Sequence, residues 1–345
     1  MAHVIKGVRV GVMRSFYVAF TLILYFTPAL HAGPPDYDYY KGKTINYIVA
    51  TKPGGGYDSY ARLIARHMVK YIPGSTIIVR NIPGAGHIIG ANETYLAKPN
   101  GLTMGTFSTG LIYSQIIGQP GIKFDLAKYS WIGKANSEHR VLIVGKNTLF
   151  KTLKGLLESK EPIKMACSGV GSGDYNETLI LAQALDANLK VIPGYNGNEA
   201  DMAIMRGEVA GIIGTYTGLR GLIKAGEARV LLQIAPKKHA ELPDVPLAAD
   251  IKVSEKGRKL ISLVAGIAEI YRLTAAPPNI ATGRLEVLRE AYKKTLRDPQ
   301  LLSDAQKVGI DINPSFGDET ARLVKEAINQ PAENLALLKK IIKVE

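Results

Sequence analysis

The chain has 345 residues, of which 46% are hydrophobic and 21% are charged, a composition typical of a globular protein large enough for two domains. Its formal net charge is +13, but the basic residues are scattered and form no aromatic-interleaved stretch of the kind that binds nucleic acid. The single cysteine, Cys167, excludes an intrachain disulfide, and the six histidines show no ligand-like spacing. We therefore expect no nucleic-acid partner, no metal and no cofactor.

The N-terminus has the pattern of a secretory signal peptide. Lys6, Arg9 and Arg14 precede the apolar stretch "FYVAFTLILYFTPA", which is short for a membrane span. Ala32 is a small residue at a suitable cleavage position, although Leu30 is less usual two residues before it. We predict a signal peptide over residues 1–32 and export of the chain. An uncleaved membrane anchor is the alternative.

From residue 41 onward, short apolar runs alternate with helical stretches, which predicts βα units and mostly parallel sheets. In the first block we expect strands over 44–50, 75–82 and 102–108, separated by helices over 58–72 and 83–98. Asp58 and Ser59 are both favourable N-cap residues for the first of these helices.

A second block of the same kind begins near residue 141. It is predicted to contain helices over 176–185 and 199–207, and strands over 141–145, 163–169, 189–194, 209–215 and 228–235. A proline-punctuated loop follows over 242–250. Beyond the apolar run 263–275 the chain becomes helical, with one helix over 281–298 and an amphipathic helix at the C-terminus.

The two blocks share an order of apolar strand, glycine-rich loop with an acidic residue, and helix. The loops are "PGGGYD" in the first block and "SGVGSGD" in the second. A helix N-terminus presents unsatisfied N–H donors and the positive end of the helix dipole, so each loop is a candidate anion site. The first loop lacks the residues of a Walker loop and of a dinucleotide fingerprint. A carboxylate-sized cup and a plain turn both remain open.

The second loop adds hydroxyl groups to the bare backbone. Ser168 and Ser172 suit hydrogen bonding to a small polar ligand, but neither has the G-x-S-x-G context of an acyl-transfer nucleophile. Cys167 has no histidine near it in sequence, so a buried structural cysteine is the better interpretation. Asp201 falls near a helix start, where a helix cap, a solvated face and a ligand contact are all open.

Several stretches in order resemble the tripartite tricarboxylate transporter substrate-binding proteins, the TctC or Bug receptors. The matching stretches include "PGGGYDSYARLIARHM", "VRNIPGAGHIIGAN", "KPNGLTMGTFST", "CSGVGSGDYNETLILAQAL" and "ARVLLQIAPKKHAELPDVPLAADI". The tail "LTAAPPNIATGRLEVLREAYKKTLRDPQ" with "GIDI" also fits, so the resemblance covers nearly the whole chain from about residue 41.

The resemblance implies an α/β periplasmic binding protein of two lobes, roughly 41–140 with 267–345 and 141–266, each a mostly parallel sheet flanked by helices. It implies a monomeric receptor that closes on a small organic acid and delivers it to membrane permease subunits of a tripartite transporter. The lobes would hinge near the two crossings, and no residue is expected to be catalytic. The candidate ligand-binding residues are Gly54, Gly55, Gly56, Tyr57, Asp58, Ser108, Thr109, Ser168, Gly169, Gly171, Ser172 and Asp201.

Two departures from the family pattern leave the ligand open. Tyr57 stands where the family commonly has a smaller residue, and Asn196 replaces a lysine. A dicarboxylate, a tricarboxylate, an aromatic acid and an amide therefore all remain candidates. The alternatives to transport are a secreted hydrolase or transferase that uses the same cleft, and a receptor that signals to a membrane sensor kinase.

Overall fold

A computed structural model of the chain describes residues 1–3, 7, 34–195 and 198–342. The chain divides into two units, Met1–Ala32 and Gly33–Glu345, and the fold below is that of the second unit. Most of the predicted signal peptide, and Asn196, lie outside the described residues, so the signal peptide stays a prediction. No helix among the described residues is both long and apolar enough to cross a membrane.

Two sheets organise this unit. The first has six strands in the order β11-β4-β10-β3-β1-β2. Its strands are β1 (Thr44–Val49), β2 (Thr76–Asn81), β3 (Thr103–Phe107), β4 (Ser130–Asn136), β10 (Tyr271–Ala276) and β11 (Ser315–Phe316). The helices that belong to this part of the chain are α1 (Gly56–Met68), α2 (Ile88–Leu96), α3 (Gly110–Ile117), α9 (Thr282–Thr295), α10 (Pro299–Lys307), α11 (Gly317–Ile328) and α12 (Ala332–Ile341).

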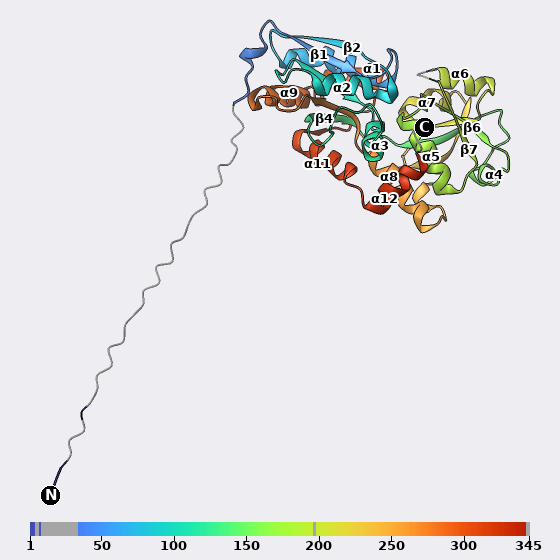
Figure 1. Ribbon diagram of the computed structural model, residues 1–345. Coiled ribbons are helices and arrows are strands. Elements are labelled where there is room, and N and C mark those ends of the chain that lie inside the picture. The colour runs from blue at the N-terminus through green and yellow to red at the C-terminus, as the bar shows by residue number, and fades with distance from the viewer. Residues whose placement is uncertain (4–6, 8–33, 196–197, 343–345) are drawn as a thin grey trace. The chain divides into compact units, whose positions relative to one another are not determined.

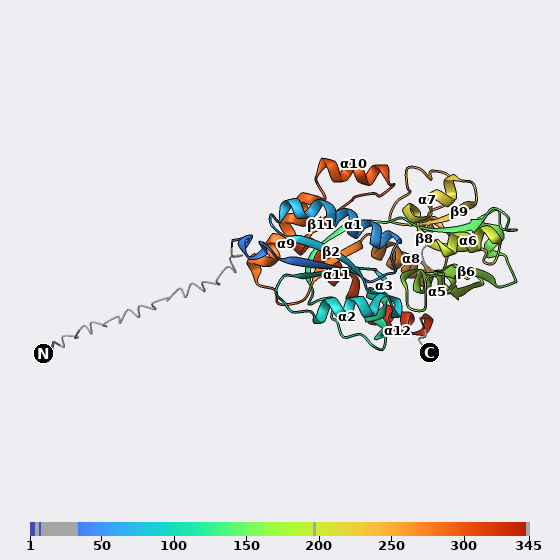
Figure 2. The same cartoon turned by 90° about the horizontal axis from the view of Figure 1, so that it is seen from above.

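The second sheet has five strands in the order β7-β6-β8-β5-β9. These are β5 (Arg140–Gly145), β6 (Ile163–Cys167), β7 (Leu189–Pro193), β8 (Gly211–Thr215) and β9 (Ala228–Ile234). They carry α4 (Leu153–Leu157), α5 (Gly173–Leu185), α6 (Glu199–Arg206), α7 (Tyr216–Lys224) and α8 (Glu255–Ala268). Short 3₁₀ turns lie at Asp38–Tyr40, Val69–Tyr71, Ala85–His87 and Ala248–Asp250. In both views the second-sheet strands gather with α4–α7, apart from β1, β2 and α1 (Figures 1 and 2). We call the two groups the first and second lobes.

The two-lobed α/β class is confirmed, but both sheets are mixed rather than mostly parallel. Parallel pairing joins β1 to β2 and β3, and β6 to β7 and β8. Antiparallel pairing involves β10, β11 and β5. The reason is topological, because β4 leads directly into β5 and α8 leads into β10. These strands enter their sheet from the other lobe and not through a right-handed βα crossover.

The chain crosses between the sheets at residues 137–139 and 269–270, and these two segments are hydrogen-bonded to each other. The Glu138 N–H donates to the Ala268 carbonyl at 3.0 Å. Lys134 Nζ and Ser137 Oγ donate to the Glu269 carbonyl at 2.7 and 3.0 Å. The predicted hinge positions therefore lie side by side. The exact lobe limits stay a prediction, since α12 at the C-terminal end packs against both α3 and α5.

Local expectations fail at two places. The helix α1 begins at Gly56 with Gly55 as its N-cap, so neither Asp58 nor Ser59 caps it. The apolar run 263–275 divides into the end of α8 and the strand β10. A short buried helix and a buried strand cannot be told apart by apolar periodicity, because both are apolar on all sides. The completely buried strand β5 is recognised correctly by the same continuous run.

Asp298 provides a test of the packing beneath the first lobe. It is the N-cap of α10 and accepts hydrogen bonds from the Gln300 N–H at 2.8 Å and the Tyr71 hydroxyl at 2.6 Å, while also pairing with Lys70. It thus joins α10 to the end of α1, which lie together in Figure 2. We expect Asp298→Ala to lower the free energy of unfolding by about 1–2 kcal/mol in a denaturant titration.

The matched variant Asp298→Asn keeps the capping oxygen and should lose less stability. Hydrogen bonds from Lys70 and Tyr71 hold the pKa of Asp298 well below its usual range, so this stabilisation is present at neutral pH and is lost only as the pH falls through the folded-state pKa. An alanine variant as stable as the parent at pH 7 would show that the cap contributes nothing.

Candidate functional site

A cleft of about 950 Å³ lies between the lobes. The first lobe contributes the loops that follow β1, β2 and β3, and the second contributes the loops after β6 and β8 with the start of α6. Most of these loops leave the carboxyl ends of parallel strands, the usual place for a ligand in an α/β sheet. The cleft therefore has the position of a binding site before any side chain is considered.

Most of the predicted site residues line this cleft. They are Gly54, Gly55, Gly56, Tyr57, Ser108, Thr109, Ser168, Gly169, Ser172 and Asp201. Asp58 and Gly171 were predicted with them but do not line the cleft. Both of these residues nevertheless shape its walls, each in a different way.

Asp58 holds the first glycine loop, "PGGGYD", in shape through hydrogen bonds to its carboxylate. Its carboxylate accepts the Gly54 N–H at 3.0 Å, Arg62 Nε at 2.9 Å and Asn81 Nδ2 at 2.9 Å. Although burial opposes the charge, the hydrogen bonds from these three groups hold the pKa of Asp58 below its ordinary value. Gly54 therefore serves the loop, where its φ of +83° requires a glycine, and its N–H does not point at a ligand.

The first turn of α1 remains open on the cleft side. Its N-cap is Gly55, and no side chain caps it. The N–H groups of Gly56 and Tyr57 accordingly have no partner among the described residues, and both residues line the cleft. Unsatisfied donors at the positive end of a 13-residue helix form the anion-binding arrangement that the sequence predicts.

The second loop is occupied by its own acidic side chain. Asp174 accepts the Ser168 N–H at 2.7 Å, the Ser168 hydroxyl at 2.8 Å, the Tyr175 N–H at 3.1 Å and the Ser172 hydroxyl. Ser172 is in addition the N-cap of α5. The hydroxyl groups that we expected to bind a ligand are thus engaged within the loop, so this wall differs chemically from the first.

Gly171 lies where the two lobes touch. Its φ is +79°, and a Cβ at this position would be 2.8 Å from Gln119 Nε2 of the first lobe. A Cβ on Gly86 would in turn be 2.9 Å from the Gly171 carbonyl carbon. Backbone therefore meets backbone beside the cleft, and only glycine leaves room for that approach.

Two buried arginines that the sequence analysis missed line the cleft. Arg140, at the start of β5, is paired with Glu177 of α5 through its Nε at 2.6 Å and donates to the Ile213 carbonyl at 3.3 Å. Burial raises the pKa of Glu177 to about 7, against the opposing effect of Arg140. A signal was present for Arg140, because it begins an otherwise apolar strand.

Arg272, in β10, is the second buried arginine. Its guanidinium carbon lies 4.2 Å from the ring centre of Tyr57 and 4.7 Å from those of Tyr60 and Tyr271. Its backbone has a φ of +57°, a conformation that non-glycine residues rarely adopt. Nothing in the local pattern "YRLTAA" predicts that Arg272 meets α1, since the contact joins segments more than 200 residues apart.

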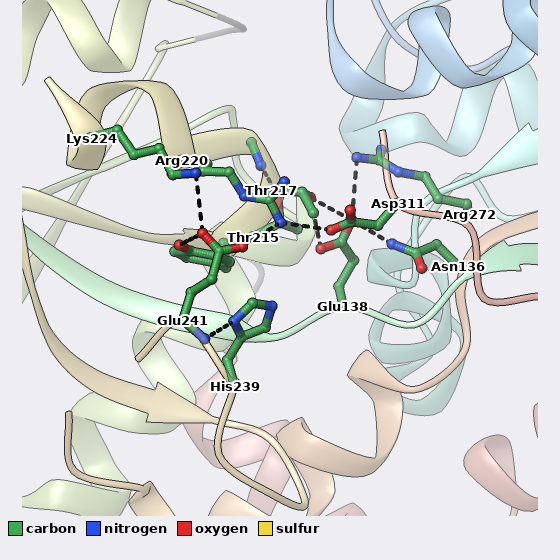
Figure 3. A network of polar contacts seen from close by, with 12 residues as sticks. Asn136, Glu138, Thr215, Thr217, Arg220, Lys224, His239, Glu241, Arg272 and Asp311 are labelled. Carbon is green, nitrogen blue, oxygen red and sulfur yellow. Dashed lines mark hydrogen bonds and ion pairs between the residues drawn. The ribbon is translucent and has the colours of Figure 1, made fainter. Parts of the chain in front are cut away.

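The arginines are connected to the crossings by Glu138. This buried carboxylate accepts the Thr217 hydroxyl at 2.7 Å and Asn136 Nδ2 at 3.3 Å, and it lies 3.9 Å from Arg272 (Figure 3). Farther along, Arg220 of α7 pairs with Asp311 of the first lobe at 2.9 Å. Polar contacts thus join the second lobe both to the crossing and to the first lobe.

The structure gives little support for a cysteine nucleophile or a metal site near the cleft, as far as the described residues show. Burial raises the pKa of the Cys167 thiol to about 12, which keeps the sulfur protonated. Among the residues that the structure describes, no group of His, Cys, Asp and Glu is arranged to hold a metal ion. The cleft offers hydrogen-bond donors and charges, and the hydroxyls of Ser168 and Ser172 that line it both donate to the carboxylate of Asp174.

Comparisons with known proteins agree with this geometry. Residues 60–341 match the model of a family described as tripartite tricarboxylate transporter family receptor. A UPF0065 protein from the tcbD-tcbE intergenic region of Pseudomonas sp. (strain P51) is 26% identical over 79% of this chain and 80% of its own. Protein BugT of Bordetella pertussis is 25% identical over 65% of this chain and 70% of its own.

Solved structures share the fold at low sequence identity. The periplasmic binding protein BugD superposes with a TM-score of 0.72 at 22% identity, covering 89% of this chain and 99% of its own. MatC from Rhodopseudomonas palustris with bound malate gives 0.68 at 20% identity, covering 87% and 99%. A second R. palustris protein, with adipate, gives 0.69 at 18% identity, covering 87% and 98%.

The buried ion pair can be tested by removing either partner. Arg140→Met and Glu177→Met should each lower the free energy of unfolding by roughly 3–5 kcal/mol, because each leaves a charge buried alone. The double variant should lose less than the sum of the two. Denaturant titrations of all four proteins measure the coupling, and additive losses would mean that the two side chains act independently.

His87, on the cleft wall, predicts a pH dependence. Burial lowers the pKa of His87 from 6.5 to about 4. At a pH between these values, the imidazole is therefore protonated in the unfolded chain and neutral in the folded chain. Stability from this group is therefore present above pH 6.5 and is lost as the pH falls toward 4. His87→Asn, which suits the φ of +82°, should flatten the fall in melting temperature over that range. Parallel curves for parent and variant would contradict this.

Proposed function

Because this chain belongs to the tripartite tricarboxylate transporter receptor family, we propose that it is a periplasmic solute receptor that binds a small organic carboxylate in the cleft between its lobes. The observation that carries the proposal is the uncapped N-terminus of α1, which opens onto the cleft and whose Gly56 and Tyr57 N–H groups have no partner among the described residues. Delivery of the ligand to membrane permease subunits follows from the same family membership.

The cleft and its surroundings suit capture and release. Its volume of about 950 Å³ exceeds the needs of a small acid and leaves room for water. The two structural neighbours with bound malate and adipate are consistent with a carboxylate ligand of this size. The hydrogen-bonded crossings at residues 137–139 and 269–270 would serve as the hinge about which the lobes, 41–140 with 267–345 and 141–266, approach each other.

The receptor proposal is preferred to the enzyme alternative because the matching family is one of transporter receptors and the cleft has donors for binding. We propose that the chain acts as a monomer and without a cofactor. Nucleophilic thiol chemistry is not available to Cys167, because burial raises the pKa of its thiol and keeps the sulfur protonated.

A thermal-shift screen of the purified protein against organic acids and their amides tests the proposal. Ligand that binds only the folded state at 100 times its Kd adds about 2.7 kcal/mol of stability, which raises the melting temperature by several degrees. We expect a shift with at least one carboxylate that is absent with the corresponding diamide or ester. A shift with none of the acids, after refolding to remove copurified ligand, would refute the carboxylate receptor.

A further inference from the structure

The two walls of the cleft carry opposite charge. The first-lobe wall presents Lys52, Arg272 and the N-terminus of α1. The second-lobe wall presents Asp174 and Asp201, while its arginine, Arg140, is paired with Glu177. A ligand that spans the cleft therefore meets a positive field at one end and a negative field at the other.

Arg272 is held rigidly but has unused hydrogen-bonding capacity. Only 5% of the residue is exposed, and three tyrosine rings surround its guanidinium. Its Nε is buried without a partner, and no hydrogen bond links any of its N–H groups to a described residue. Glu138 is 3.9 Å away, beyond hydrogen-bond distance. A buried arginine normally has its donors satisfied, so this one lacks an acceptor.

The guanidinium also lies directly against the start of α1. A Cβ on Gly56 would be 2.5 Å from Arg272 NH2 and 3.2 Å from its central carbon. A cation beside the positive end of a helix is unfavourable unless an anion lies between them or next to both. The arginine without a hydrogen-bond acceptor and the uncapped helix therefore point to the same group, a carboxylate.

The opposite wall would repel a second carboxylate. Asp174 already fills its loop, and Asp201 is half-buried at the first turn of α6. Among the described residues no lysine, arginine or histidine forms an ion pair with Asp174 or Asp201. Two carboxylates outside any ion pair favour a hydrogen-bond donor or a positive charge on the ligand.

We propose that Arg272 and the N-terminus of α1 form the anchoring site for a single carboxylate, and that the ligand's far end carries an ammonium or another hydrogen-bond donor facing Asp201, beside the negative charge of Asp174. This deepens the proposed receptor function, on which it rests, by assigning the ligand class. It also assigns Arg272 as a specificity-determining residue, because the guanidinium can hold a carboxylate with two parallel hydrogen bonds.

A matched ligand series tests the charge pattern. Calorimetric titration would compare unbranched dicarboxylates, ω-amino monocarboxylates and the corresponding unsubstituted monocarboxylates at chain lengths of two to six carbons. We expect the tightest ω-amino acid to bind at least tenfold more tightly than the dicarboxylate of equal length. Equal or tighter binding of the dicarboxylates would overturn this inference while leaving the carboxylate receptor intact. Binding of none of these acids would overturn both.

Variants separate the two ends of the ligand. Arg272→Gln should weaken every carboxylate in the series at least tenfold, and Asp201→Asn should weaken the ω-amino acids relative to the dicarboxylates. Arg284→Gln is a matched control, because Arg284 stacks at 3.6 Å on Tyr39 and does not line the cleft. Its affinities should equal those of the parent.

If Arg272→Gln does not fold, Gly56→Ala provides a second route. Its new methyl group would displace the Arg272 guanidinium from α1 without removing the charge, and should also weaken carboxylate binding at least tenfold. Unchanged affinity in a folded Arg272→Gln or Gly56→Ala protein would overturn the role of Arg272.

Discussion

The structure depends on how the chain passes between its two sheets. There are two crossings, at residues 137–139 and 269–270, and each hydrogen-bonds to the other. This arrangement makes β5 and β10 antiparallel to the strands on either side of them. It also brings the loops after β1, β2 and β3 to face the loops after β6 and β8, so the cleft follows from the topology. Glu138 in the first crossing then connects the hinge to Arg272 within the cleft.

The cleft is built from two similar loops that have diverged in chemistry. In both loops an aspartate in the first turn of the following helix accepts a backbone N–H group of the loop. Asp58 accepts the N–H of Gly54, and Asp174 accepts the N–H of Ser168. In the first loop this leaves the helix N-terminus open, with an arginine beside it. In the second loop the hydroxyls of Ser168 and Ser172 also donate to the aspartate. The first wall is therefore rich in hydrogen-bond donors and the second wall is acidic, so the two ends of a ligand in the cleft meet different chemistry.

Sequence reasoning recovered the features that local pattern controls. The glycine loops after β1 and β6 and the small polar residues Ser108 and Thr109 after β3 were predicted because strand, loop and helix are adjacent in sequence. Asp58 and Gly171 were also predicted to bind the ligand but do not line the cleft, so their part in binding stays a prediction. An aspartate that stabilises its own loop and one that binds a ligand look alike in sequence. Arg140 and Arg272 were missed because their partners lie on distant segments, Glu177 and the α1 N-terminus.

The two glycine-rich loops, each held by its own aspartate, affect how quickly a solute is bound. Asp58 and Asp174 hold their loops in shape through several hydrogen bonds each, all of them to groups of the chain itself. The conformational entropy of ordering these loops is therefore lost when the protein folds and not when the solute arrives. The recognition surface of each lobe is complete before the encounter. Association then requires only the relative motion of two rigid walls, so the rate of lobe closure and not loop folding would limit how quickly a bound solute is retained.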